Sequence, residues 1–187
     1  MVASVKHTLV ALVEDKPGVL NRSASLFRRR GFNIESIAVG HSEIRGLSRM
    51  TIVVDGASTA VEQVEKQLYK LVDVVKVIDI TEDRMVSREL ALIKVSATAA
   101  QRSEIVQIAD IFRARIVDVA PDSVMIEVTG DEAKLNSLLE LLKDFGIKEL
   151  VRTGRIAMVR GTSEAVPIDE ESVQKIKRRR KKTKTEK

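Results

Sequence analysis

The chain has 187 residues, enough for one domain or two small ones, and 44% of them are hydrophobic, which is ordinary for a protein with a buried core. Only 3% are aromatic and none is cysteine, so aliphatic side chains must fill the core, and disulfides and cysteine-ligated metals are excluded. No apolar run reaches the roughly 18 residues that a membrane span needs, and the N-terminus lacks the pattern of a signal peptide. We therefore expect a cytoplasmic protein that makes no membrane contact.

The formal net charge of +5 is unevenly distributed along the chain. Residues 175–187 contain nine Lys or Arg and one Glu, which leaves residues 1–174 at −3. A run of like charges without apolar residues is usually a disordered, solvated tail. The alternative is an electrostatic contact of this tail with an acidic partner subunit or with nucleic acid.

The first half of the chain alternates between strand-like and helix-like patterns. In the first predicted helix, Leu20, Ala24 and Phe27 recur at helical spacing, and Gly31 ends the helix. Strands are predicted at 7–13, 32–39, 47–54 and 74–80, and helices at 17–30 and around 61–71. The order of these elements is βαββαβ.

The same order is predicted to repeat after a polar segment at 82–88. Strands are predicted at 90–97, 115–120, 124–129 and 147–159, the last with a bend at Gly154, and helices around the apolar stripes 105–112 and 135–142. The fold class is therefore α+β, with two ferredoxin-like βαββαβ domains that share topology rather than residue identity. We place the first domain at 5–82, a linker at 83–88, the second domain at 89–163 and a basic, disordered tail at 164–187.

Strands such as 7–13 are apolar at successive positions, although both helices of a ferredoxin-like unit cover one face of its sheet. The second face therefore needs its own cover. Self-association, or docking on another protein, is the expected source of that cover.

The turn between the first strand and the first helix reads EDKPGVL, residues 14–20. Pro17 suits the first turn of a helix, and Asp15 can cap the free N–H groups beyond it. Gly18 leaves the amides of Gly18, Val19 and Leu20 open to close approach, so they could hold a carboxylate while Asp15 receives an ammonium group. From these residues alone two interpretations stay open: a turn shaped only for folding, and a site for an α-amino acid.

Longer stretches of the sequence resemble one family. The segment EDKPGVLNRSASLFRRRGFNIESIAVG resembles the start of an ACT domain, the small-molecule-sensing module of many amino-acid enzymes. The segments LSRMTIVVDG and QVEKQLYKLVDVVKV follow in the order found in the regulatory small subunit of acetolactate synthase, also called acetohydroxyacid synthase. Weaker matches to that family are RELALIKVSA, IFRARIVDV and VRTGRIAMVRG, so the resemblance covers about residues 5–160.

The resemblance implies a non-catalytic regulatory subunit. Such a subunit binds the large subunit, which makes acetolactate with thiamin diphosphate, magnesium and FAD, whereas no cofactor is expected in this chain. It activates the large subunit and confers feedback inhibition by valine in branched-chain amino acid biosynthesis. The family also implies a homodimer through the ACT domain, with the effector at the dimer interface.

The effector site that the resemblance implies draws on both protomers. The turn of one protomer supplies Asp15, Gly18, Val19 and Leu20, and the other supplies Asn33, with Ile34 and Val39 near the branched side chain. The sequence departs from the family at Asp15, where the family often has Asn. A carboxylate there favours the ammonium group of the effector and repels its carboxylate.

Two other functions compete with this interpretation. A nucleic-acid-binding regulator could use an ACT-like unit as sensor and the basic tail to grip phosphate, but the sequence has no helix-turn-helix pattern and no aromatic platform. A self-contained enzyme would need a catalytic half, and the sequence contains no triad, P-loop or GxGxxG motif. His7 and His41 do not have metal-ligand spacing, so we expect no metal site and no catalytic residue.

Overall fold

The computed structural model describes residues 5–56 and 58–161, which form two compact units. The first unit contains the described residues up to Val86 and from Ala157 onward, and the second contains Ser87–Ile156. The predicted basic tail at 164–187 lies outside the described residues. No helix in the described part of the chain is both long and apolar enough to cross a membrane.

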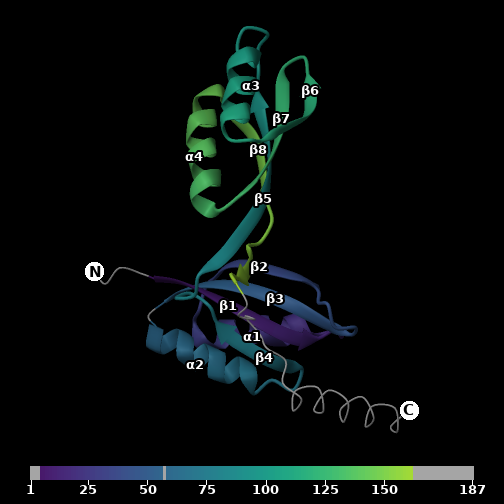
Figure 1. Ribbon diagram of the computed structural model, residues 1–187, viewed down its shortest axis with the longest axis vertical. Coiled ribbons are helices and arrows are strands. Elements are labelled where there is room, and N and C mark those ends of the chain that lie inside the picture. The colour runs from purple at the N-terminus through teal and green to yellow at the C-terminus, as the bar shows by residue number, and fades with distance from the viewer. Residues whose placement is uncertain (1–4, 57, 162–187) are drawn as a thin grey trace. The chain divides into compact units, whose positions relative to one another are not determined.

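The first unit is a four-stranded antiparallel sheet with two helices (Figure 1). Its elements are β1 (Val5–Glu14), α1 (Val19–Arg30), β2 (Ile34–His41), β3 (Leu47–Gly56), α2 (Ser58–Tyr69) and β4 (Val74–Asp79). The strand order β2-β3-β1-β4 places the first and third strands at the centre, as a ferredoxin-like unit requires. The predicted βαββαβ order is therefore confirmed for this half.

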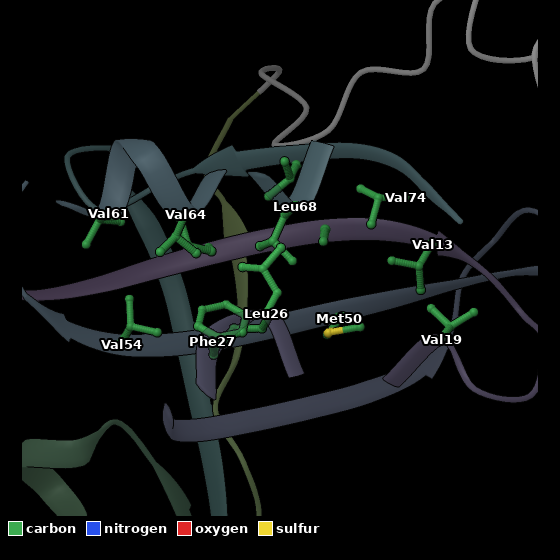
Figure 2. Packing of buried hydrophobic residues seen from close by; sticks show 14 residues of the cluster. Val13, Val19, Leu26, Phe27, Met50, Val54, Val61, Val64, Leu68 and Val74 are labelled. Atoms are coloured by element: carbon green, nitrogen blue, oxygen red, sulfur yellow. The ribbon is translucent and has the colours of Figure 1, made fainter. Parts of the chain in front are cut away.

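Both helices of this unit pack on the same face of the sheet, where their apolar stripes meet alternate residues of the strands. Figure 2 shows Leu26 and Phe27 of α1 and Val64 of α2 directed toward strand residues such as Val54 and Met50. Leu9 and Ile52, on the two central strands, have no solvent exposure. Full burial of one such side chain contributes about 1.5–3 kcal/mol, so this layer dominates the stability of the unit.

The opposite face of the same sheet is also apolar, and the chain covers part of it with its own residues. Val10 and Leu12 on β1 are fully buried there, in a cluster that includes Ala157, with Met85 and Val159 packed against it. The prediction that both faces need cover is thus confirmed. Part of that cover comes from the chain itself, a source that the sequence patterns did not indicate.

The second unit repeats the arrangement of the first. Its elements are β5 (Met85–Ser96), which enters this unit at Ser87, α3 (Arg102–Ile111), β6 (Arg115–Ala120), β7 (Ser123–Gly130), α4 (Glu132–Leu142), a 3-10 turn (Lys143–Phe145) and β8 (Ile147–Arg152). The next strand, β9 (Ile156–Val159), begins at the last residue of this unit and continues in the first. The strand order β6-β7-β5-β8 matches that of the first unit, and β9 pairs with β5. Ile93, Ile126 and Leu138 are completely buried between the sheet and its helices.

Several element boundaries differ from the predicted ones. The strand predicted at 32–39 is β2, Ile34–His41, so Asn33 lies just before it. The helix predicted from residue 17 begins at Val19, and the segment 83–88 predicted as a linker includes the first residues of β5. The strand predicted at 147–159 is two strands, β8 and β9, separated around Gly154. Residues 157–161 group with the first unit, because Ala157 and Val159 pack on its sheet.

Candidate functional site

The predicted site begins at the turn that joins β1 to α1. Gly18 has φ 84° and ψ −7°, the conformation of the third residue of a type II turn, and the N–H of Val19 closes the turn on the carbonyl of Lys16 at 3.4 Å. Pro17 therefore occupies the second turn position, just before the helix, rather than the first helical turn as predicted. Glycine is required at 18 because its φ lies in the left-handed region.

Asp15 does not cap the helix, contrary to the prediction. Its carboxylate accepts a hydrogen bond from Ser48 Oγ at 3.3 Å, and its other oxygen lies 3.4 Å from His41 Nδ1. None of the described side chains caps helix α1, and its first turn contains no acidic residue. Asp15 is half exposed, so one side of the carboxylate remains open to a cation.

The start of α1 therefore offers unpaired amides. The N–H groups of Gly18, Leu20 and Asn21 donate to none of the described residues, whereas the N–H of Val19 is taken up in the turn. Asn21 thus replaces Val19 in the predicted set of free amides. Converging N–H groups at a helix start, together with the positive end of the helix dipole, favour a bound anion.

Arg22 adds a positive charge that sequence reasoning missed. Its Nη1 atom lies 3.1 Å from the position that a Cβ on Gly18 would take, so the guanidinium stands directly beside the open turn. Nε donates to the carboxylate of Asp73 at 2.6 Å, and that carboxylate is only 7% exposed. The spacing of four residues between Gly18 and Arg22 could have indicated this, since such pairs lie on one helix face.

The apolar residues of the predicted site divide into two groups. Leu20 and Val39 are 49% and 48% exposed, and Val39 lies on the same face of β2 as His41, two residues away. Val19 is 5% exposed within the core, and Ile34 packs against the same core. Within one chain, Leu20 and Val39 are therefore available to a ligand, and the side chains of Val19 and Ile34 support the fold.

One chain does not bring Asn33 to the turn. Asn33 is exposed and immediately precedes β2, whereas His41, the neighbour of Asp15, ends that strand. Eight residues of extended strand span about 26 Å, so Asn33 and Asp15 lie at opposite ends of β2. The two halves of the predicted site can meet only through a second chain.

The described residues also form a groove of about 450 Å³ beside α2 and β4, away from the turn. Its lining residues are Glu62, Glu65, Lys66, Tyr69, Lys70 and Val77. Partial burial and the nearby charges of Asp79 and Glu62 raise the pKa of Glu65.

No group of three metal-ligating side chains occurs within residues 5–56 and 58–161. The buried His7 instead pairs with the partly exposed Asp79, with Nδ1 at 2.7 Å from the carboxylate.

Comparison with known proteins gives matches along most of the chain. The family described as "AHAS small subunit-like ACT domain" matches residues 9–76, and the family "Small subunit of acetolactate synthase" matches residues 88–161. The probable acetolactate synthase small subunit of Archaeoglobus fulgidus is 60% identical over 157 residues, which cover 84% of this chain and 98% of that protein. The acetolactate synthase small subunit of Mycobacterium bovis is 52% identical over 83% of this chain and 92% of its own length.

A crystal structure supports the same likeness in three dimensions. The acetolactate synthase small subunit of Thermotoga maritima is 46% identical, and its structure superposes with a TM-score of 0.78. The match covers 85% of this chain and 99% of that one.

Proposed function

Because the chain belongs to the family of acetolactate synthase small subunits, with an ACT domain in its first half, we propose that it activates a catalytic large subunit and makes that enzyme sensitive to valine. The chain itself is non-catalytic in this proposal. Thiamin diphosphate, magnesium and FAD belong to the large subunit, which joins two pyruvate molecules, or pyruvate and 2-oxobutyrate.

The observation that carries the proposal is the cluster of hydrogen-bond donors at the start of α1, made of unpaired amides and a guanidinium that Asp73 holds in place. The amides of Gly18, Leu20 and Asn21 and the guanidinium of Arg22 can hold a carboxylate, and the half-exposed Asp15 can accept hydrogen bonds from an ammonium group. These are the two charged groups of a free α-amino acid. The donors are held by folded structure, because Gly18 fixes the turn and Asp73 anchors Arg22.

The aliphatic preference rests on the two exposed apolar side chains nearby. Leu20 and Val39 lie on α1 and β2, the elements that border the polar cluster, and each is about half exposed. A hydrophobic wall distinguishes one methylene group by about 1–3 kcal/mol. Valine, leucine and isoleucine should therefore differ in affinity without absolute discrimination.

A homodimer through the ACT unit completes the site in this proposal. Strand β2 is an edge strand whose strand neighbour in the described chain is β3. If a second copy pairs antiparallel about the middle of β2, its residue 34 lies opposite His41, and its Asn33 arrives beside Asp15. The effector then contacts both protomers, and its binding favours one arrangement of the dimer. A coupling free energy of about 1–3 kcal/mol would change activity about 5–150-fold.

Calorimetric titration of the chain with valine, leucine and isoleucine, with and without the large subunit, tests the proposal. We expect saturable binding with a preference among the three, and inhibition of acetolactate formation over the same concentration range. The chain alone should form no acetolactate, and adding it should raise the activity of the large subunit. A chain that is strictly monomeric and binds none of the three amino acids, even with the large subunit, would refute the effector site.

A further inference from the structure

Strand β6 forms one edge of the second sheet and carries exposed apolar side chains. Its strand neighbour in the described chain is β7, so its outer edge presents unpaired backbone groups (Figure 1). Val117 and Val119 are 48% and 57% exposed. An open strand edge with apolar side chains favours pairing with another strand.

A bulge gives this edge an unusual distribution of charge. Arg115 pairs with Glu127 and Ile116 with Ile126, but the register then shifts so that Asp118 pairs with Met125. In a regular strand, residues three apart point to opposite faces, whereas this shift places Arg115 and Asp118 on the same face. Neither side chain forms an ion pair or hydrogen bond with any other residue that the structure describes.

We propose that β6 pairs antiparallel with β6 of a second copy of this chain, with Arg115 of each copy beside Asp118 of the other. A two-fold axis perpendicular to the sheet reverses the strand direction and keeps each side chain on its own face. Each positive charge then meets a negative charge, and the pair is made twice. The exposed valines are covered by the partner strand.

The other edge of this sheet does not offer the same complementarity. On β8, Lys148 is paired with Asp122 at 2.6 Å, and Arg152 is paired with the buried Glu89 at 2.6 Å. Those cations would have to leave their partners to bind a second chain. Arg115 and Asp118 on β6 have no such partner within residues 5–56 and 58–161, so β6 is the edge that fits a second copy.

This contact is separate from the effector site, because β6 belongs to the second unit and β2 to the first. It goes beyond the proposed function, which requires association only through β2. Each contact can fail without the other. Valine binding reports on the first, and a probe placed on β6 reports on the second.

Cysteine cross-linking tests the contact directly, since the natural chain has no cysteine. One full-length chain carries Arg115→Cys and a differently sized chain carries Asp118→Cys, and they are mixed under mild oxidation. In the proposed register these two residues are neighbours, and the second Arg–Asp pair remains intact. The two copies of residue 115, in contrast, are offset by about two residues along the strands and by one spacing between the strands. Their Cα atoms are therefore more than ~8 Å apart, which is too far for a disulfide.

We therefore expect a mixed disulfide in the mixture and little cross-linking of either chain alone. Asp118→Cys mixed with Glu104→Cys, an exposed position on α3, is the matched control and should not cross-link. Absence of the mixed disulfide overturns the proposal, as does preferential cross-linking of these cysteines to the large subunit in the holoenzyme.

Charge inversion with hydrogen exchange gives an independent readout. In the Asp118→Arg variant by itself, residues 115 and 118 that face each other both carry a positive charge, and in Arg115→Asp by itself both carry a negative charge. The backbone amides of β6 should then exchange at least tenfold faster in either variant than in the natural chain. Mixing the two variants restores opposite charges at both positions and should restore the protection. If mixing does not restore it, the proposed pairing is wrong. Retained inhibition by valine would show that this failure leaves the effector site intact.

Discussion

Replacing Gly18 with Asp places a carboxylate among the unpaired amides where the carboxylate of the effector is proposed to bind. The new Cβ would lie 3.1 Å from Arg22 Nη1, at the end of a flexible side chain that can move by a few tenths of an ångström. The added carboxylate can then bind the guanidinium and the amides itself. The new aspartate would therefore occupy the position where the carboxylate of the effector is proposed to bind.

The expected loss of affinity follows from the contacts removed. A hydrogen bond to a charged group contributes about 1.5–3 kcal/mol, so the loss of two such bonds costs at least about 3 kcal/mol. That corresponds to a rise in the dissociation constant of valine of roughly 150-fold. Activation of the large subunit should be retained, because the substitution touches neither core of the chain.

Gly18→Ala is the matched control, because it introduces the same backbone strain at φ 84° without a charge. A non-glycine residue in this conformation costs about 1–2 kcal/mol, which thermal unfolding should detect in both variants. The assays are calorimetric titration with valine and inhibition of acetolactate formation by the reconstituted enzyme. The reasoning is refuted if Gly18→Asp stays as sensitive to valine as the natural chain, or if Gly18→Ala loses as much sensitivity as Gly18→Asp.

Three further predictions use neighbouring residues as controls. Arg22→Lys keeps the positive charge but loses the planar set of donors of the guanidinium, so calorimetry should show that valine binds about tenfold more weakly. The control is Arg28→Lys, an exposed position on the same helix, which should bind valine as tightly as the natural chain does. Leu138→Ala, at a fully buried position, should lower the free energy of unfolding in urea by about 2–5 kcal/mol, whereas Leu141→Ala, 51% exposed, should change it little. Burial and nearby carboxylates raise the pKa of Glu65 above its ordinary 4.5, so Glu65→Gln should stabilise the fold at neutral pH, with the gain vanishing below pH 4.5. Lys66 lowers the pKa of Glu62, so Glu62→Gln should show the opposite sign, a small loss at neutral pH that disappears in acid.

The element order could be predicted because local patterns decide it. The apolar stripe of α1, ended by Gly31 in a left-handed conformation, and the continuous apolar run of β1 have no good alternative structure. The strand order then follows, since a repeated βαββαβ unit has few ways to bury both helix stripes on one sheet. The bend predicted at Gly154 is a break between two strands. The assignment of Ala157 to the first unit depends on packing between distant segments, so periodicity could not reveal it.

The candidate site was predictable only in part, for a similar reason. A proline and a glycine between a strand and a helix indicated a turn with exposed amides, and Gly18 does adopt that conformation. The partner of Asp15 could not be predicted, because Ser48 reaches it from a strand 33 residues away. The orientation of Arg22 likewise depends on Asp73, which lies 51 residues further along the chain.

The sequence by itself determined which residues alternate as strands, which form amphipathic helices, and where glycine must allow the chain to turn. These are properties of neighbouring residues, set by backbone sterics and the spacing of apolar side chains. Tertiary structure alone decided which carboxylate holds Arg22, which hydroxyl turns Asp15 away from the helix, and which segment covers the second face of the first sheet. Those outcomes depend on groups far apart in the chain, which meet only when burial of the apolar layers brings the strands together.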